Sequence, residues 1–278
     1  MENFVGVGVG GDDDVLVKQK KPKFLFLHGG PGSHRDWRFL SGALKEIHDE
    51  LPWLDIPSVI RVDLPGHGKS SRAESADAQN MIELTMRGLK SNSVEGPWVL
   101  VGHSLGGHAA LEASVLPEVV GCGFLAPVSL SVHKGIRPHT VTKWLAAQTE
   151  RNEVTKRMTE LVYKKVLGFP ARHEKEEFCW TMNRAASLDF RRARDIVKKF
   201  EKPYWLGYAN DDHLIEKEIF REFADELRKG GEGRGEVMEF EDGGHNVQKT
   251  RAREIAKGLL RWYAFHFSQL GRDGGAKL

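Results

Sequence analysis

The sequence predicts an α/β fold, in which a mostly parallel central sheet is flanked by helices and a helical cap is inserted between two strands. Three observations support this prediction. Short apolar runs alternate with amphipathic segments along most of the chain. Glycine-rich turns follow several of these runs, and one long stretch, 128–202, contains no convincing strand. The length of 278 residues suits one large domain that carries an insertion.

The composition excludes several classes of protein. The chain has 41 Lys and Arg against 39 Asp and Glu, a net charge of +2, which is too balanced for a nucleic-acid-binding protein. No apolar run reaches the roughly 18 residues that a membrane-spanning helix needs. Two cysteines, Cys122 and Cys179, are too few for a disulfide framework or a cysteine-based zinc site. The N-terminal segment lacks a signal-peptide pattern, so we expect a cytoplasmic protein.

Apolar runs are predicted to form the strands of the sheet. They span 23–27, 58–62, 98–101, 119–126, 204–208 and 236–240. Helices are predicted where apolar residues recur every three or four positions, over 37–51, 81–89 and 250–267. A further helix is expected after Gly106, where small residues allow close packing on a sheet.

Residues 128–202 are predicted to form the helical cap, which leaves 1–127 and 203–278 as the two parts of the core. The cap range carries 17 Lys and Arg against 9 Asp and Glu, a charge of +8, whereas the remainder of the chain has −6. Two interpretations stay open. The basic residues form solvated helix faces, or they form a basic lid that favours anionic substrates.

A serine lies where the third predicted strand ends, within Gly102-His103-Ser104-Leu105-Gly106. The segment matches the G-x-S-x-G motif and has the strand before it and the helix after it that this motif requires. The sharp turn strains the serine backbone, so its neighbours must be small. The hydroxyl is then exposed at the carboxyl edge of the sheet, and the N–H of Leu105 points toward a developing oxyanion. Ser104 is therefore the candidate nucleophile.

A second glycine-rich turn, His28-Gly-Gly-Pro-Gly32, ends the first predicted strand. Glycines there let the backbone approach a substrate without steric obstruction. A plain strand-to-helix turn would use the same residues. Because the turn precedes the serine motif in the chain, we expect the N–H of Gly30 to act as the second oxyanion donor.

The motifs HGGPG, DLPGHGKS, GHSLGG and a late GGH, in this order, resemble those of the α/β-hydrolase superfamily over residues 23–267. The HGGPG form is similar to that of proline iminopeptidases and related capped hydrolases, whereas GHSLGG resembles the esterase and lipase-like form. The resemblance implies the α/β-hydrolase fold, a cap at 128–202 and a catalytic triad in the order serine, acid, histidine. Serine at the nucleophile position sets the chain apart from the epoxide hydrolases and haloalkane dehalogenases, which use aspartate there.

The resemblance implies an acid after the fifth predicted strand, where Asp211 and Asp212 are adjacent. Members of the superfamily have an acid, one further residue and then two apolar residues, and the run Asp-His-Leu-Ile that begins at Asp212 fits this spacing. Asp212 is therefore the expected acid, with Asp211 as the alternative. His245, on a glycine-rich loop after the last predicted strand, has the position that the triad order demands. In that role its Nε2 takes the Ser104 proton.

The motifs together predict a serine hydrolase that cleaves an ester bond of a small molecule through an acyl-enzyme, with an amide as the less favoured substrate. His103, Trp144 and Trp180 are candidates for contacting the substrate, and the aromatic residues would serve equally as the cap's own core. His28, His67 and His103 are expected to belong to the scaffold, not to act as the base. No histidine–carboxylate group has metal-ligand spacing and no dinucleotide motif follows the first strand, so we expect neither metal nor cofactor.

Two other functions stay open. The same fold can serve as a non-catalytic ligand receptor or scaffold, and the same serine can transfer an acyl group to an acceptor other than water. The presence of serine, aspartate and histidine in the required order weighs against a receptor.

Overall fold

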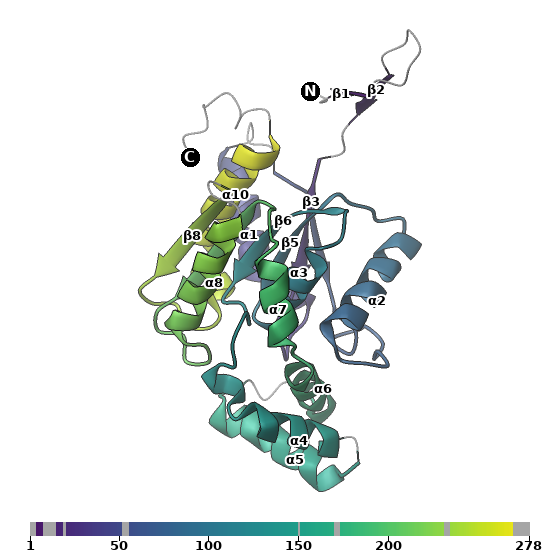
Figure 1. Ribbon diagram of the computed structural model, residues 1–278, viewed down its shortest axis with the longest axis vertical. Helices are drawn as coiled ribbons and strands as arrows, with labels where there is room; N and C mark the ends of the chain where they lie inside the picture. Colours follow the sequence, from purple (N-terminus) through teal and green to yellow (C-terminus); the bar gives the residue numbers. More distant parts are fainter. Residues whose placement is uncertain are drawn as a thin grey trace.

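The computed structural model describes residues 4–7, 15–18, 21–51, 56–149, 151–169, 173–230 and 234–268. Within them, a six-stranded sheet has the order β4-β3-β5-β6-β7-β8, and all its neighbouring strands are parallel (Figure 1). The strands are β3 (Lys23–Leu27), β4 (Val59–Val62), β5 (Trp98–His103), β6 (Val119–Leu125), β7 (Tyr204–Ala209) and β8 (Gly235–Phe240). The predicted parallel sheet is confirmed.

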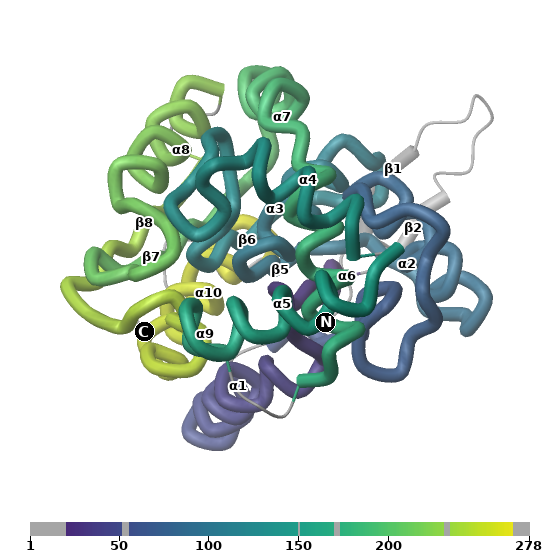
Figure 2. Tube along the Cα trace, turned by 90° about the horizontal axis from the view of Figure 1, so that it is seen from below, coloured from purple at the N-terminus to yellow at the C-terminus, as the bar shows by residue number. Residues whose placement is uncertain are grey.

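Helices cover both faces of the sheet (Figure 2). One face carries α1 (Arg38–Glu50) and α10 (Ala252–Phe267), and the other carries α2 (Ala78–Ser91), α3 (Leu105–Ala113), α7 (Phe190–Val197) and α8 (Lys217–Gly230). Strands that are buried on both faces need apolar side chains at every position. In β3, Phe24 and Leu25 point to opposite faces and both have no exposed surface. This is why the inner strands β3, β5, β6 and β7 are largely apolar runs in the sequence.

Two helices begin at residues other than those predicted. The helix predicted from 250 is divided into α9 (Val247–Thr250) and α10, because Arg251 leaves the helical conformation with φ −120° and ψ 30°. Helix α2 begins earlier than predicted, where the Asp77 side chain accepts a hydrogen bond from the Asn80 N–H. A short 3₁₀ helix, η1 (His34–Trp37), precedes α1.

The N-terminal strands β1 (Phe4–Val7) and β2 (Val15–Lys18) form a separate antiparallel pair, in which Phe4 lies opposite Lys18. The sequence analysis did not predict this pair. Each strand has only four residues, too few for a clear alternating pattern.

Three helices of the predicted cap pack on one another beside the carboxyl edge of the sheet (Figure 1). They are α4 (His139–Thr149), α5 (Glu153–Leu161) and α6 (Lys175–Ala186), with the short segments η2 (Lys134–Ile136) and η3 (Val162–Val166) beside them. Tyr163, Phe178 and Met182 form a small apolar core among them. By contrast, Ala193 and Val197 of α7 are part of the main core. We therefore propose that the cap comprises α4 to α6 and that α7, although within 128–202, belongs to the core.

Helix α6 is hydrogen-bonded to the segment of the core that follows β4. Trp180 donates its indole N–H to the Pro65 carbonyl over 2.8 Å, and a Cβ at Gly66 would collide with the indole ring. Ser187 Oγ donates to the Ala76 carbonyl over 3.1 Å. These contacts fix the helix that faces the carboxyl ends of β3 and β5.

Candidate active site

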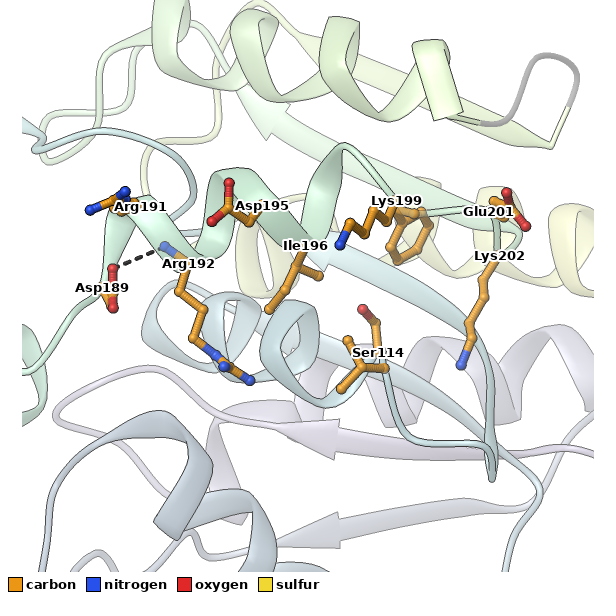
Figure 3. Close-up of a pocket in the computed structure, with 11 residues that line it drawn as sticks. Ser114, Asp189, Arg191, Arg192, Asp195, Ile196, Lys199, Glu201 and Lys202 are labelled. Atoms are coloured by element: carbon orange, nitrogen blue, oxygen red, sulfur yellow. Dashed lines mark hydrogen bonds between the residues drawn. The ribbon is translucent and has the colours of Figure 1, made fainter.

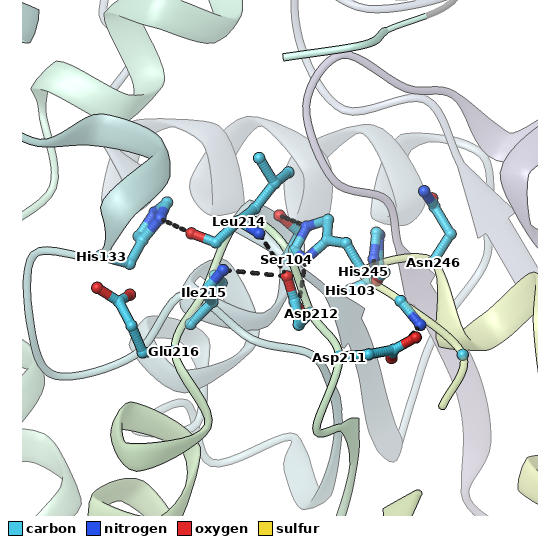
Figure 4. A network of polar contacts seen from close by, with 12 residues as sticks. His103, Ser104, His133, Asp211, Asp212, Leu214, Ile215, Glu216, His245 and Asn246 are labelled. Carbon is cyan, nitrogen blue, oxygen red and sulfur yellow. Dashed lines mark hydrogen bonds and ion pairs between the residues drawn. The ribbon is translucent and has the colours of Figure 1, made fainter. Parts of the chain in front are cut away.

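Ser104, Asp212 and His245 lie on three separate turns that meet at the carboxyl edge of the sheet (Figure 4). Ser104 follows β5, Asp212 follows β7 and His245 follows β8. In a parallel sheet the carboxyl ends of all strands share one edge, which is where such folds bind ligands. The topology therefore makes neighbours of Ser104 and His245, which are 141 positions apart in the chain.

Ser104 occupies a strained turn between β5 and α3. Its φ of 54° and ψ of −122° lie outside the conformations that non-glycine residues normally adopt. A Cβ at Gly102 would collide with the backbone of Gly106, and a Cβ at Gly106 would collide with the carbonyl oxygens of Leu27 and His28. The two glycines of the motif are thus required by close backbone approach, as predicted from the sequence.

Ser104, His245 and Asp212 form a continuous chain of hydrogen bonds. Asp212 Oδ2 lies 2.7 Å from His245 Nδ1, and Ser104 Oγ lies 2.9 Å from His245 Nε2. An ionised carboxylate can only accept, so the imidazole donates its Nδ1–H to Asp212. The Nε2 lone pair then accepts the Ser104 hydroxyl proton. This arrangement can remove a proton from the serine.

The Asp212 carboxylate is held in place from two sides. Its other oxygen, Oδ1, accepts the backbone N–H groups of Leu214 at 2.7 Å and Ile215 at 3.0 Å. Burial by itself would raise the pKa of this carboxyl. The hydrogen bond and charge of His245, together with the two N–H groups, outweigh burial and hold the pKa below its usual value. Asp212 is therefore ionised at neutral pH.

Asp211 does not contact His245 in this arrangement. Its exposed side chain accepts the backbone N–H of Gly244 over 2.7 Å (Figure 4). The two adjacent aspartates thus support the same histidine loop differently, Asp212 through the imidazole and Asp211 through the backbone.

Histidines of the glycine-rich motifs hold the scaffold together. His103 Nε2 donates to the His245 carbonyl over 2.9 Å, and burial, followed by the nearby His245, lowers the pKa of His103 to about 3. His28 Nε2 accepts the Leu64 N–H over 3.0 Å, and burial lowers the pKa of His28 to about 4. His67 Nε2 accepts a hydrogen bond from Arg184 over 3.1 Å. His28 and His103 are neutral at physiological pH, and the Nε2 of each forms a hydrogen bond with a backbone group.

Two backbone N–H groups beside Ser104 are available to an oxyanion. Leu105 is the first residue of α3, and first-turn N–H groups have no acceptor within their helix. Gly30 lies against the same point, since a Cβ on it would be 2.9 Å from Leu105 Cδ1 and 2.7 Å from Thr181 Cγ2. No acceptor for either N–H is present in the part of the chain that the structure describes.

The two tryptophans that the sequence suggested as substrate contacts lie apart from Ser104. Trp144 is 61% exposed on the outer surface of the cap. Trp180 is buried, but it packs on the loop at Pro65 and lines neither cavity beside Ser104. His103 is the member of that group that adjoins the site.

Two cavities adjoin Ser104 and His245. One, of about 70 Å³, also contacts Asp36 and Lys249, whose side chains pair with each other over 2.8 Å. The other, of about 40 Å³, lies between the sheet edge and the cap. Among the described residues, no lysine or arginine of the cap range lines either cavity.

The smaller cavity contains two polar residues that the sequence analysis did not identify, His133 and Thr181. His133 lies between β6 and η2, and Thr181 lies on α6. Neither belongs to a motif, and only the docking of the cap on the core brings them together. No local sequence signal could have identified them.

A larger groove of about 510 Å³ lies on another part of the surface, beside α7 (Figure 3). It is lined by both signs of charge, including Arg191, Asp195 and Lys199. It shares no lining residue with the cavities at Ser104.

The described ranges contain neither a metal-ligating cluster nor a membrane-spanning helix. No cluster of three or more histidine, cysteine or acidic side chains there is placed to ligate a metal ion. No helix in the same ranges is both long and apolar enough to span a bilayer.

The model of the alpha/beta hydrolase family matches residues 24–257. A 2-succinyl-6-hydroxy-2,4-cyclohexadiene-1-carboxylate synthase from Citrobacter koseri is 32% identical over 104 residues, which are 37% of each chain. Matches to related synthases likewise span about a third of their length.

Among solved structures, an esterase from Exiguobacterium antarcticum aligns with a TM-score of 0.63 and 14% identity over 94% of both chains. MenH from S. aureus aligns with a TM-score of 0.61 and 16% identity, over 94% of this chain and 97% of that one. These similarities show a shared fold. Together with the family match, they show that the chain belongs to the alpha/beta hydrolase family.

Proposed function

We propose that this protein is a serine hydrolase that cleaves short-chain, uncharged esters through an acyl-enzyme. Ser104 is the nucleophile, His245 the general base and Asp212 the acid of the triad. One observation carries this proposal. The hydrogen-bond chain from Asp212 through His245 to Ser104 has distances of 2.7 and 2.9 Å, and it ends at a serine on a strained turn.

In the first half of the reaction, Ser104 Oγ attacks the ester carbonyl carbon as His245 Nε2 takes its proton. The carbonyl oxygen becomes an oxyanion, and the N–H groups of Leu105 and Gly30 stabilise it. Each such donor contributes on the order of 10²–10³ in rate. When the tetrahedral intermediate collapses, the bond to the leaving alcohol breaks and His245 returns the proton to the alcohol oxygen. The acyl group stays on Ser104.

In the second half, His245 takes a proton from a water molecule, whose oxygen attacks the acyl carbon. A second oxyanion forms in the same place and collapses with cleavage of the bond to Ser104 Oγ. His245 gives the proton back to Ser104, and the free acid leaves. Asp212 stays ionised throughout and stabilises the imidazolium that forms twice in the cycle.

The cavities limit the size and charge of the substrate. The cavity of about 40 Å³ has room for about three water-sized groups at about 10–15 Å³ each. An acyl chain of a few carbons fits this space. The lysine among the described lining residues, Lys249, is already paired with Asp36. These features favour a short, neutral ester over an anionic one.

The similar proteins include an esterase and synthases that are named for a carboxylate compound. A carboxylate is bound most effectively by an unpaired arginine or lysine. The pairing of Lys249 with Asp36 therefore favours ester hydrolysis here. A receptor role gains no support, because binding a ligand does not require the strained Ser104 turn.

A fluorophosphonate probe tests this proposal. We expect the unmodified protein to be labelled, Ser104→Ala to be unlabelled, and Ser114→Ala to be labelled as the unmodified protein is. Ser114 is a matched control because it is also buried, but it lies at the opposite end of α3, where its Oγ donates to the Leu111 carbonyl. Failure to label the unmodified protein would refute the serine hydrolase function.

A further inference from the structure

The cavity between the sheet edge and the cap contains two buried polar atoms without partners. Most of its lining is apolar, including Leu105, Tyr163 and Leu214. His133 Nε2 and Thr181 Oγ1 have no hydrogen-bond partner among the described residues. The two side chains are buried, with exposures of 6% and 2%. Buried polar groups are almost always paired, so an unpaired couple beside a nucleophile calls for an explanation.

His133, a lining residue of the cavity, has a hydrogen-bond acceptor without a partner among the described residues. Its Nδ1 lies 2.9 Å from the Leu214 carbonyl (Figure 4), which can only accept, so Nδ1 carries the proton and Nε2 carries the lone pair. Burial lowers the pKa of His133 to about 4, so the ring remains neutral at physiological pH. The ring is also confined by Gly135, where a Cβ would lie 3.1 Å from it. The acceptor is therefore fixed in both protonation and position.

Thr181, which lines the same cavity, has a hydroxyl without a hydrogen-bond partner among the described residues. Buried threonines in helices commonly bond to a carbonyl one turn earlier, as Thr85 does with Met81 over 2.7 Å and Thr149 does with Ala146. Thr181 makes no such bond. Thr181 follows Trp180, whose indole N–H is hydrogen-bonded to the Pro65 carbonyl of the core. The Thr181 hydroxyl is therefore held beside Gly30.

We propose that this cavity recognises a hydroxyl group on the acyl part of the substrate, which donates to His133 Nε2 and accepts from the Thr181 hydroxyl. A hydroxyl suits the two atoms because it is both donor and acceptor. His133 and Thr181 both line this cavity of about 40 Å³. The substrate class is then short hydroxyacyl esters. This inference rests on the proposed esterase function.

The experiment compares 4-nitrophenyl 3-hydroxybutyrate with 4-nitrophenyl butyrate. An analogue that lacks the hydroxyl would leave the two buried polar groups unpaired, so we expect kcat/KM of the unmodified protein to favour the hydroxy ester by at least about 100-fold. Thr181→Val and His133→Phe should each reduce this ratio by at least about tenfold, whereas Thr181→Ser, which keeps the hydroxyl, should preserve it. Thr85→Val is the matched control, and its ratio should equal that of the unmodified protein.

Equal kcat/KM for the two esters, or a ratio that Thr181→Val and His133→Phe leave unchanged, would overturn the proposal. Binding of the same two esters to Ser104→Ala separates this proposal from the esterase function. A preference for the hydroxy ester in binding, without turnover by the unmodified protein, would support the hydroxyl site and refute the hydrolase. Equal affinities would overturn the hydroxyl site even if both esters are hydrolysed.

Discussion

Replacing Asp212 with asparagine is expected to nearly abolish activity while preserving the fold. The amide oxygen can still accept the Leu214 and Ile215 N–H groups, which now bond to Asp212 Oδ1. The amide nitrogen would replace Oδ2, 2.7 Å from His245 Nδ1, and would donate to it. The imidazole would then carry its proton on Nε2, where it cannot accept one from Ser104.

The size of the effect follows from that tautomer. A comparable change in a serine protease lowers kcat by about 10⁴-fold, which corresponds to about 5.4 kcal/mol at 1.36 kcal/mol per tenfold. The assay is kcat/KM for 4-nitrophenyl acetate at pH 7.5. Asp211→Asn is the matched control and should retain activity within about tenfold, because its amide oxygen can still accept the Gly244 N–H. A larger loss for Asp211→Asn than for Asp212→Asn would refute the assignment of the acid.

Two further predictions concern the oxyanion turn and acid stability. Gly30→Ala should lower kcat by about 10²–10³-fold, because the new Cβ would lie 2.7 Å from Thr181 Cγ2 and displace the N–H. Gly42→Ala is the control and should leave kcat unchanged, because its Cβ meets nothing within 4 Å. Equal kcat for both variants would contradict the role of the Gly30 N–H as an oxyanion donor. The free energy of unfolding, measured by urea denaturation, should fall as pH decreases from 6.5 toward 4. The pKa values of His28 (about 4) and His103 (about 3) in the folded protein are below the unfolded value of about 6.5. The unfolded chain therefore binds more protons than the folded protein in this pH range. A free energy of unfolding that is constant or increases on acidification would contradict their being buried in the neutral form.

The sheet could be predicted because its sequence pattern is local. A strand buried on both faces is a continuous apolar run, as in β3 and β5, and the glycines around Ser104 are required by short backbone contacts that any such turn imposes. The serine and histidine positions then follow from where parallel strands end.

Other features could not be predicted, because they depend on packing between distant segments. The amphipathic pattern of α7 is the same whether the helix packs on a cap or on the core, and only the structure shows Ala193 and Val197 in the main core. Trp180 belongs to an aromatic-rich cap sequence, but its contact with Pro65 depends on how the cap docks. The meeting of His133 and Thr181 in one cavity depends on the same docking.

The proposed acyl-enzyme on Ser104 is tested most directly by intact-protein mass spectrometry after rapid acid quenching of a reaction with 4-nitrophenyl butyrate. We expect the unmodified protein to gain the mass of one butyryl group, peptide mapping to locate that group on Ser104, and Ser104→Ala to gain none. An acyl group on another residue, or steady hydrolysis of the ester by Ser104→Ala at the rate of the unmodified protein, would contradict the proposed mechanism.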